Sequence, residues 1–185
     1  MKKRFRIELL RLHFTALAIA VLNSISKYAI AYSLESRMEM GIQLLTALSG
    51  LALFFFYLKP FRRKLLYFSI YALTGFLFSI GLIFRGVFWG MVLSVLLFPV
   101  MPNTTRFEKD GIIISTPYRG FLAACCIYQV KERHLLIFER HYDVWYSQGP
   151  IDMALVNVRS DRNSIEVTYP SHDQEGVFLS KTIKK

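Results

Sequence analysis

Four long runs of apolar residues, separated by short charged breaks, occupy the first hundred positions of the chain. They cover residues 14–34, 41–58, 65–84 and 86–101. A hydrocarbon core about 30 Å thick requires about 20 apolar residues in an α-helix, and the first three runs come close to that length or reach it. The fourth run is shorter, and Pro99 limits its regular part. Four such runs in succession predict membrane helices rather than the buried helices of a soluble protein.

The third and fourth runs are separated only by Arg85 and Gly86. Residues 65–101 are too many for one helix that crosses a bilayer, so we expect a helical hairpin that turns at this pair. The first two runs form another hairpin in the same way. Residues 1–102 are therefore predicted to be a transmembrane domain of four α-helices, arranged as two antiparallel hairpins.

After Met101, the pattern changes to short β-branched and aromatic runs separated by turn residues. The strongest hairpin signal is Asp110-Gly111, which has the composition of a two-residue turn. The apolar run 120–130 indicates a buried central strand or, alternatively, a helix on the membrane surface, and a turn is expected at Glu132-Arg133. Strands are expected at 104–109, 112–116, 120–130, 135–141, 151–158, 165–169 and 177–183. Residues 103–185 are thus predicted to form a small antiparallel β barrel or sandwich.

The formal net charge of +10 is concentrated in the first half of the chain. Residues 1–102 contain twelve Lys and Arg against three Asp and Glu, whereas residues 103–185 contain eleven against ten. A nucleic-acid partner is not expected, because it would require a basic surface on the folded tail. We instead expect contacts with anionic lipid headgroups from Lys2, Lys3, Arg4, Arg6, Arg62, Arg63 and Lys64.

The basic residues also predict an orientation. They precede the first apolar run and lie between the second and third, whereas the other two connections carry little positive charge. The positive-inside rule places these basic segments in the cytoplasm, and four spans return the tail to the same side. The expectation is a multi-pass protein of the plasma (bacterial inner) membrane with both termini cytoplasmic. Cleavage of a signal peptide after Ala29-Ile30-Ala31 is an alternative, although the polar residues around Lys27 suit it poorly.

Lys27 is the only charged residue within an apolar run. At helical steps of three and four, it shares a face with Ala16, Ala20 and Asn23. Two interpretations stay open for this face. It lines a pore, because a charge inside the membrane is costly and usually functional. Alternatively, its small residues pack against another helix while Lys27 extends to the headgroups.

Small residues at a spacing of four predict further positions of helix packing. Gly75 precedes Ser79 by four, and Gly86 precedes Gly90 by four. Such pairs allow two helix backbones to approach closely in a membrane, in one chain or between copies in an oligomer. The four apolar runs contain no Asp or Glu. This composition disfavours a proton- or sodium-coupled transporter, which usually carries carboxylates at mid-membrane.

The tail offers few candidates for catalysis or metal binding. Cys125 and Cys126 are adjacent and lack the second ligand pair of a structural zinc site. Neighbouring strand residues point to opposite faces, and a cytoplasmic location disfavours a disulfide, so both are expected to be core residues. His141 and Asp143 lie two apart and would share a face if the strand expected at 135–141 continued past His141. No nucleophile motif accompanies them, so a solvated strand end is the favoured interpretation. No metal or cofactor is expected.

Acidic and basic residues alternate along the tail, a pattern that is typical of a hydrated face. The acidic members are Glu132, Glu139, Asp152 and Glu166, and the basic ones are Arg133, Arg140, Arg159 and Arg162.

The leading hypothesis from the sequence is a non-enzymatic membrane protein whose β-domain binds a partner protein or further copies of itself. The second is an oligomeric pore or ligand-sensing effector in which Lys27 lines the path. The third is an enzyme at the lipid interface that uses His141 and Asp143.

Overall fold

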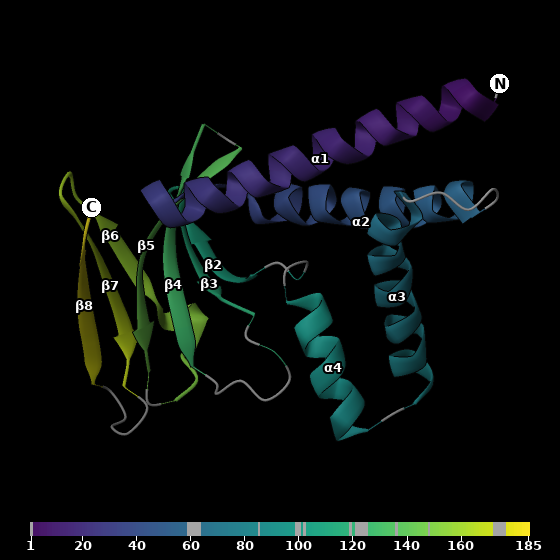
Figure 1. Ribbon diagram of the computed structural model, residues 1–185. Helices are drawn as coiled ribbons and strands as arrows, with labels where there is room; N and C mark the ends of the chain where they lie inside the picture. The colour runs from purple at the N-terminus through teal and green to yellow at the C-terminus, as the bar shows by residue number, and fades with distance from the viewer. Residues whose placement is uncertain are drawn as a thin grey trace. The chain divides into compact units, whose positions relative to one another are not determined.

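The computed structural model describes residues 2–58, 64–84, 86–98, 101, 103–118, 120, 126–135, 137–147, 149–171 and 177–185. The chain divides into two compact units (Figure 1). The helical unit comprises Met1–Ile25, Arg37–Met101 and Arg119–Leu122. The β unit comprises Ser26–Ser36, Pro102–Tyr118 and Ala123–Lys185. The β unit therefore includes the segment that connects the first two helices.

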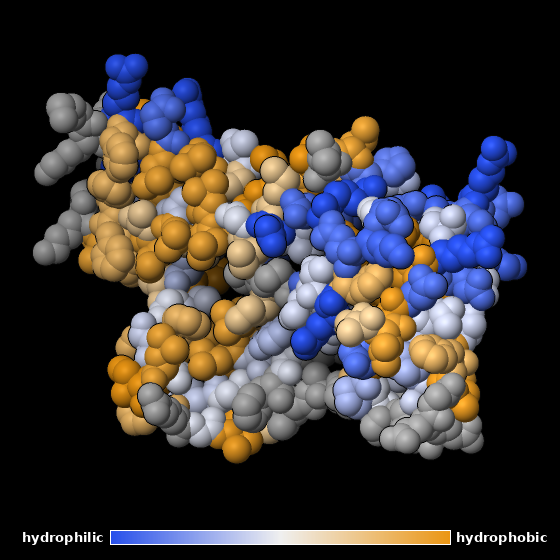
Figure 2. All heavy atoms as spheres, turned by 180° about the vertical axis from the view of Figure 1, so that it is seen from behind, coloured by the Kyte–Doolittle hydropathy of each residue, from blue (hydrophilic) through white to orange (hydrophobic). Residues whose placement is uncertain are grey.

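Three helices have the length and composition needed to cross a membrane. They are α1 (Lys2–Ile30), α2 (Ser36–Leu58) and α3 (Lys64–Ile83). The fourth, α4 (Val87–Leu97), has 11 residues, or about 16 Å at 1.5 Å per residue, about half of a hydrocarbon core. Three expected helices are thus confirmed in length, whereas the fourth is too short to span. Figure 2 shows a broad hydrophobic surface of the kind that lipid covers.

The first three helices pack around aromatic side chains. Leu53 and Tyr57 of α2 and Phe68 of α3 are buried together, and the rings of Tyr57 and Phe68 stack with centroids 5.6 Å apart. Arg6 of α1 places its guanidinium 5.3 Å from the centre of the Tyr57 ring. The start of α1 therefore lies beside the end of α2, as in an antiparallel hairpin.

Two glycines mark the closest approaches between helices. A Cβ added to Gly50 of α2 would lie 2.6 Å from the ring of Tyr71 in α3. A Cβ added to Gly81 of α3 would lie 2.8 Å from the side chain of Leu93 in α4. Real Cβ atoms do not approach a neighbour so closely, so both positions require glycine for packing.

The strands of the β unit form two antiparallel sheets. The five-stranded sheet has the order β1-β5-β4-β3-β2, and the three-stranded sheet has the order β6-β7-β8. Their bounds are β1 (Tyr32–Leu34), β2 (Thr104–Lys109), β3 (Ile112–Thr116), β4 (Ile127–His134), β5 (Phe138–Tyr146), β6 (Asn157–Ser160), β7 (Ser164–Pro170) and β8 (Phe178–Lys184), with a short 3₁₀ helix η1 (Met153–Leu155) before β6. The described strands leave both sheets open, so the barrel alternative is wrong.

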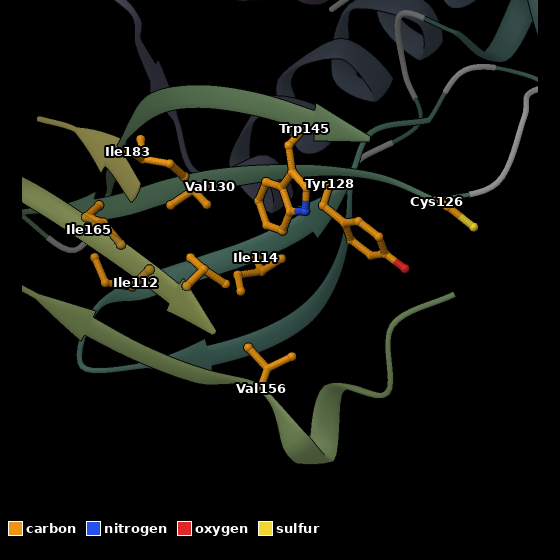
Figure 3. Close-up of a cluster of buried hydrophobic side chains, with 10 residues drawn as sticks. Ile112, Ile114, Cys126, Tyr128, Val130, Trp145, Val156, Ile165 and Ile183 are labelled. Carbon is orange, nitrogen blue, oxygen red and sulfur yellow. The ribbon is translucent and has the colours of Figure 1, made fainter. Parts of the chain in front are cut away.

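The hydrophobic core lies between the two sheets (Figure 3). Ile114 and Val130 come from the five-stranded sheet, and Ile165 and Val167 from the three-stranded sheet; all four are fully buried. Trp145 packs beside them, with its ring centre 5.5 Å from that of Tyr128. Hydrophobic residues alternate with polar ones along β7, as a strand with one buried face requires.

The Asp110-Gly111 hairpin is confirmed, since both residues have positive φ between β2 and β3. Other expected boundaries were wrong. β4 begins at Ile127 and continues through Glu132-Arg133, where a turn was expected, and the chain turns at Leu135 instead. Charged residues are accepted inside β4 because Glu132 and Arg133 find ionic partners.

The largest departure from expectation is β1. The first apolar run was expected to be helical to residue 34, but α1 ends at Ile30 and Ala31 adopts a left-handed φ of 58°. Tyr32–Leu34 then pairs antiparallel with β5, with Tyr32 opposite Arg140 and Leu34 opposite Phe138. The connection between α1 and α2 is therefore an edge strand of the sheet formed by the tail.

The glycine packing yields a prediction. We expect Gly50→Ala to lower the thermal unfolding temperature of the purified protein in detergent, because the new methyl group displaces the Tyr71 ring at a cost of about 1–3 kcal/mol. Gly75→Ala is the matched control, since its Cβ would lie 3.9 Å from Leu51, an ordinary contact. Both changes gain the same helix propensity, so equal unfolding temperatures would contradict the proposed contact.

Candidate functional site

Among the described residues, two groups of buried polar side chains form hydrogen-bonded networks, one in each unit. The His13 network lies in the helical unit and comprises His13, Ser49, Tyr67 and Tyr71. The β1 network lies in the β unit and comprises Ser33, Ser36, Lys131, Glu139 and His141. Burying polar groups is costly unless they are paired, so each network indicates a specific role.

The His13 network connects three helices. His13 of α1 is fully buried, with Nδ1 3.0 Å from Ser49 Oγ of α2 and Nε2 3.2 Å from the Tyr67 hydroxyl of α3. The Tyr67 hydroxyl in turn lies 3.3 Å from that of Tyr71. Ser49 Oγ donates to the carbonyl oxygen of Thr46, at 3.1 Å.

One arrangement of donors and acceptors, with His13 protonated on Nδ1, is consistent with these distances. Because the Ser49 hydroxyl donates to Thr46, its oxygen is free to accept from Nδ1–H of His13. Nε2 then accepts from Tyr67, which in turn accepts from Tyr71. A neutral imidazole satisfies both of its nitrogens in this way. The network therefore joins α1, α2 and α3 by polar contacts that lipid cannot replace.

The polar face expected along α1 is the buried side of that helix. Ala16 and Asn23 are both less than a tenth exposed, and His13 continues the same face by one step of three. Lys27 belongs to the β unit and lies near enough to His141 for its charge to affect the imidazole. Ala20 is partly buried between these residues. The burial of this face favours helix packing within one chain.

The β1 network is built around a buried ion pair. Lys131 of β4 and Glu139 of β5 are 2% and 3% exposed, and Lys131 Nζ lies 2.7 Å from Glu139 Oε2. Ser36, the first residue of α2, completes the pair: its Oγ accepts from Lys131 at 2.9 Å and donates to Glu139 at 3.3 Å. Neither charge could be buried alone, because desolvation would neutralise it.

His141 supplies the second contact of this network to β1. Its Nε2 lies 2.6 Å from Ser33 Oγ, and its backbone N–H donates to the carbonyl oxygen of Ala31. The Ser33 hydroxyl also lies 3.1 Å from the carbonyl oxygen of Leu34, and the tautomer of His141 sets the direction of its contact with Nε2. Burial, together with the nearby charges of Lys131 and Lys27, lowers the pKa of His141 to about 3. The imidazole is therefore neutral at physiological pH.

A second layer of charge surrounds the network on the same sheet. Arg133 of β4 lies 2.6 Å from Glu108 of β2 and 3.9 Å from Glu35, which follows β1. Glu35 also donates its backbone N–H to the carbonyl oxygen of Ile137. Ionic contacts thus extend from β1 across the sheet to its opposite edge at β2.

The structure corrects two expectations about the charged residues of the tail. Glu139 was expected on a hydrated face, but it is buried, because Lys131 and Ser36 satisfy its carboxylate. His141 and Asp143 were expected to share a face only if the strand expected at 135–141 continued, and β5 does continue to Tyr146. His141 is buried toward Ser33, whereas Asp143 is exposed and accepts from the backbone N–H of Val144. An irregularity in the register between β4 and β5 changes the alternation beside these residues.

The expectation of a free thiol at position 126 was wrong, since Cys126 is disulfide-bonded. Its place in the hydrophobic core is confirmed. A disulfide was disfavoured because a cytoplasmic location was expected for the tail. Cys126 also lies outside the strand in which it was expected, since it precedes β4 and has a φ of 76°. Cys125 lies outside the described residues.

The remaining expected residues divide into those the structure describes and those it does not. Gly75 makes an ordinary contact with Leu51, a Cβ on Gly86 would meet no described atom within 4 Å, and Gly90 accepts a hydrogen bond from Ser94. Arg4 and Lys64 are exposed at the ends of their helices. Arg62, Arg63 and the side chains of Lys2 and Lys3 lie outside the described residues.

Sequence reasoning missed His13, Ser33, Ser36 and the pairing of Lys131 with Glu139. A signal existed for the first of these, because His13 and Tyr67 are the hydrogen-bonding side chains nearest to the basic ends of the first and third apolar helices. Lys131 and Glu139 carried no such signal, since their shared partner Ser36 of α2 lies about 100 positions away.

We expect Glu139→Gln and Lys131→Met each to destabilise the protein by about 3–5 kcal/mol, because each leaves a buried charge without its partner. The double variant Lys131→Met with Glu139→Leu should lose less than the sum of the two. Thermal unfolding in detergent measures all three. Glu8→Gln breaks the exposed pair with Arg11 and should change stability by less than about 1 kcal/mol. Additive losses in the double variant would contradict a coupled pair.

The lowered pKa of His141 predicts a pH dependence. Between about 3 and the ordinary value of 6.5, the unfolded chain binds a proton that the folded chain does not. Stability is therefore fully present above pH 6.5 and is lost as the pH falls, by at most about 1.4 kcal/mol per pH unit. We expect unfolding temperatures measured between pH 7.5 and 5.0 to fall more in the wild type than in His141→Gln.

The measurement requires that Glu132 does not titrate in the same pH range as His141. Burial alone would raise the pKa of Glu132, but hydrogen bonds from Lys185 and Tyr142 hold it below its ordinary value of 4.5. Glu132 therefore stays ionised down to pH 5.0, the lower limit of the measurement. Equal slopes for the wild type and His141→Gln would show that His141 is not the group responsible.

Comparison of the chain with protein-family models, curated proteins and solved structures gave no match. Its function must therefore be inferred from the two networks, the membrane-length helices and the surface of the β unit.

Proposed function

We propose that the chain is a non-enzymatic membrane protein in which the helices form the anchor and the β unit binds an extended segment of a partner protein. The anchor is supported by three helices that are long and apolar enough to cross a bilayer. The single observation that supports binding is the surface of β8, an edge strand of the three-stranded sheet.

The first half of β8 exposes apolar side chains. Phe178 and Leu179 are 53% and 44% exposed, and neighbouring strand residues point to opposite faces of the sheet. β8 pairs with β7 on one side, and no described strand pairs with its other side. An edge strand with exposed apolar residues is a template for the addition of another strand.

The second half of β8 indicates the chemistry of the partner. Lys181 and Lys184 follow the apolar residues, and Lys184 is exposed. If two copies of β8 paired antiparallel about Lys181, Phe178 would lie opposite Lys184, which is an unfavourable match. An antiparallel segment with carboxylates followed by apolar residues would match both halves. We therefore favour a different chain with an acidic, partly apolar strand over a second copy of β8.

The geometry of His141 supports binding rather than catalysis. A serine nucleophile must be accessible to its substrate, whereas Ser33 and His141 are both buried. Both side chains are less than a tenth exposed and connect β1 to β5. The oligomeric pore stays a sequence prediction, since Ala16 and Asn23 are buried within the chain.

A photo-crosslinking residue tests this proposal in living cells. With benzoylphenylalanine in place of Phe178, we expect a crosslinked product of discrete mass, because the partner strand would contact this side chain. The same residue in place of Leu155 is the matched control, since Leu155 has the same exposure of 53% but lies in η1. Leu179→Lys should abolish the product at 178, whereas Leu155→Lys should not.

The mass of the product distinguishes the possible partners. A product of twice the chain mass would show that the partner is a second copy of this chain and not a different protein. Equal products at 178 and 155, or no product at 178, would overturn the proposal.

A further inference from the structure

We propose that the chain crosses the membrane three times and that the β unit lies on the opposite side of the membrane from the N-terminus. This topology differs from the four-span expectation and does not depend on the function proposed above. The position of β1 in the sheet is the first of four observations that support it.

The pairing of β1 shows which connection between helices lies on the same side of the membrane as the tail. Tyr32–Leu34 pairs with β5 through three residue pairs, and the pairing is extended on both sides by hydrogen bonds from Glu35 to Ile137 and from His141 to Ala31. A sheet cannot be divided by a bilayer, so the connection between α1 and α2 and the tail occupy the same side. With four spans, they would lie on opposite sides.

The opposite ends of α1 and α2 carry the basic residues. Arg6 stacks on Tyr57, and the ring of Phe5 lies 5.8 Å from that of Phe56. The basic N-terminus therefore lies beside the end of α2, directly before the basic segment 59–64. The positive-inside rule places this end in the cytoplasm. The connection that contains β1, at the opposite ends of the two helices, then lies on the non-cytoplasmic side.

The length of α4 agrees with an odd number of spans. α3 begins at the basic end and crosses the membrane, but the 11 residues of α4 are too few to cross back. Leu93 packs against Gly81, so α4 folds back along the end of α3. Trp89 at the start of α4 lies close to Phe84 and Phe88, an aromatic group typical of the membrane interface.

The disulfide at Cys126 is the fourth observation. Disulfides persist in oxidising compartments and are rare in the cytoplasm. The β unit that contains Cys126 therefore fits the non-cytoplasmic side.

One alternative also keeps β1 and the tail together. If α1 lay along the membrane surface, α2 and α3 alone would span, and the β unit would be cytoplasmic. The segment 59–64, with Lys59, Arg62, Arg63 and Lys64, would then be outside, against the positive-inside rule. The apolar composition of α1 over 27 residues also disfavours that arrangement.

Cysteine labelling in intact cells tests the topology. We expect Asp161→Cys, in the turn between β6 and β7, to react with a membrane-impermeant maleimide to the same extent before and after permeabilisation. Arg4→Cys should react only after permeabilisation. The unmodified chain, which carries Cys125 and Cys126, is the blank, and its labelling is subtracted from that of each variant. Labelling of Asp161→Cys only after permeabilisation would overturn the proposal.

A crosslink tests the sheet on which the topology rests. Leu34 and Phe138 are opposite residues of β1 and β5, so the double variant Leu34→Cys with Phe138→Cys should form a disulfide in membranes when an oxidant is added. Leu34→Cys with Asp161→Cys is the control and should stay uncrosslinked. Failure of the first pair to crosslink would also overturn the proposal, because β1 and β5 would then not be paired.

Discussion

The pairing of β1 with β5 is the constraint on which the other features of this protein depend. It makes three residues from the connection between two membrane-length helices part of a sheet formed by the tail. α1 must therefore end at Ile30, and α2 begins already at Ser36, two residues after β1. The five residues between the helices leave little freedom in how β1 enters the sheet.

The buried ion pair contributes more to the position of β1 in the sheet than to the stability of the fold. Replacing a buried ion pair with apolar residues is often neutral or stabilising, so Lys131 and Glu139 are weak evidence for a more stable fold. Ser36 adds hydrogen bonds to both members of the pair, and Ser33 contacts His141 on the same sheet. A shift of β1 by one residue would turn Ser33 to the other face of the sheet. The network therefore specifies the register of a strand that is too short to specify its own.

Local patterns predicted the parts of the fold that local residues determine. Apolar runs located three helices, and Asp110-Gly111 located a hairpin, because length and turn chemistry act over a few neighbouring residues. β1 was not predictable in this way. Tyr32–Leu34 continues an apolar run, and Ala31 adopts a positive φ without the glycine that usually marks the end of a helix.

The buried networks were hidden for the same reason. Lys131 and Glu139 are eight positions apart and separated by a turn, so their charges resemble those of a solvated strand. His13 follows a basic segment and resembles its last polar residue. Each side chain is recognisable as buried only once the partner element is in place, and those partners come from distant parts of the sequence.

The distance along the chain between β1 and its partner also bears on how the protein is made. Ser33 and His141 are 108 positions apart. At about 5–20 residues per second, synthesis of the intervening chain takes about 5–20 s. During that interval, α1 and α2 are already made, while the backbone groups of β1 have no strand to pair with. The sheet is thus completed only after the membrane helices have been synthesised, and the tail must reach the same side of the membrane as β1 before it can fold.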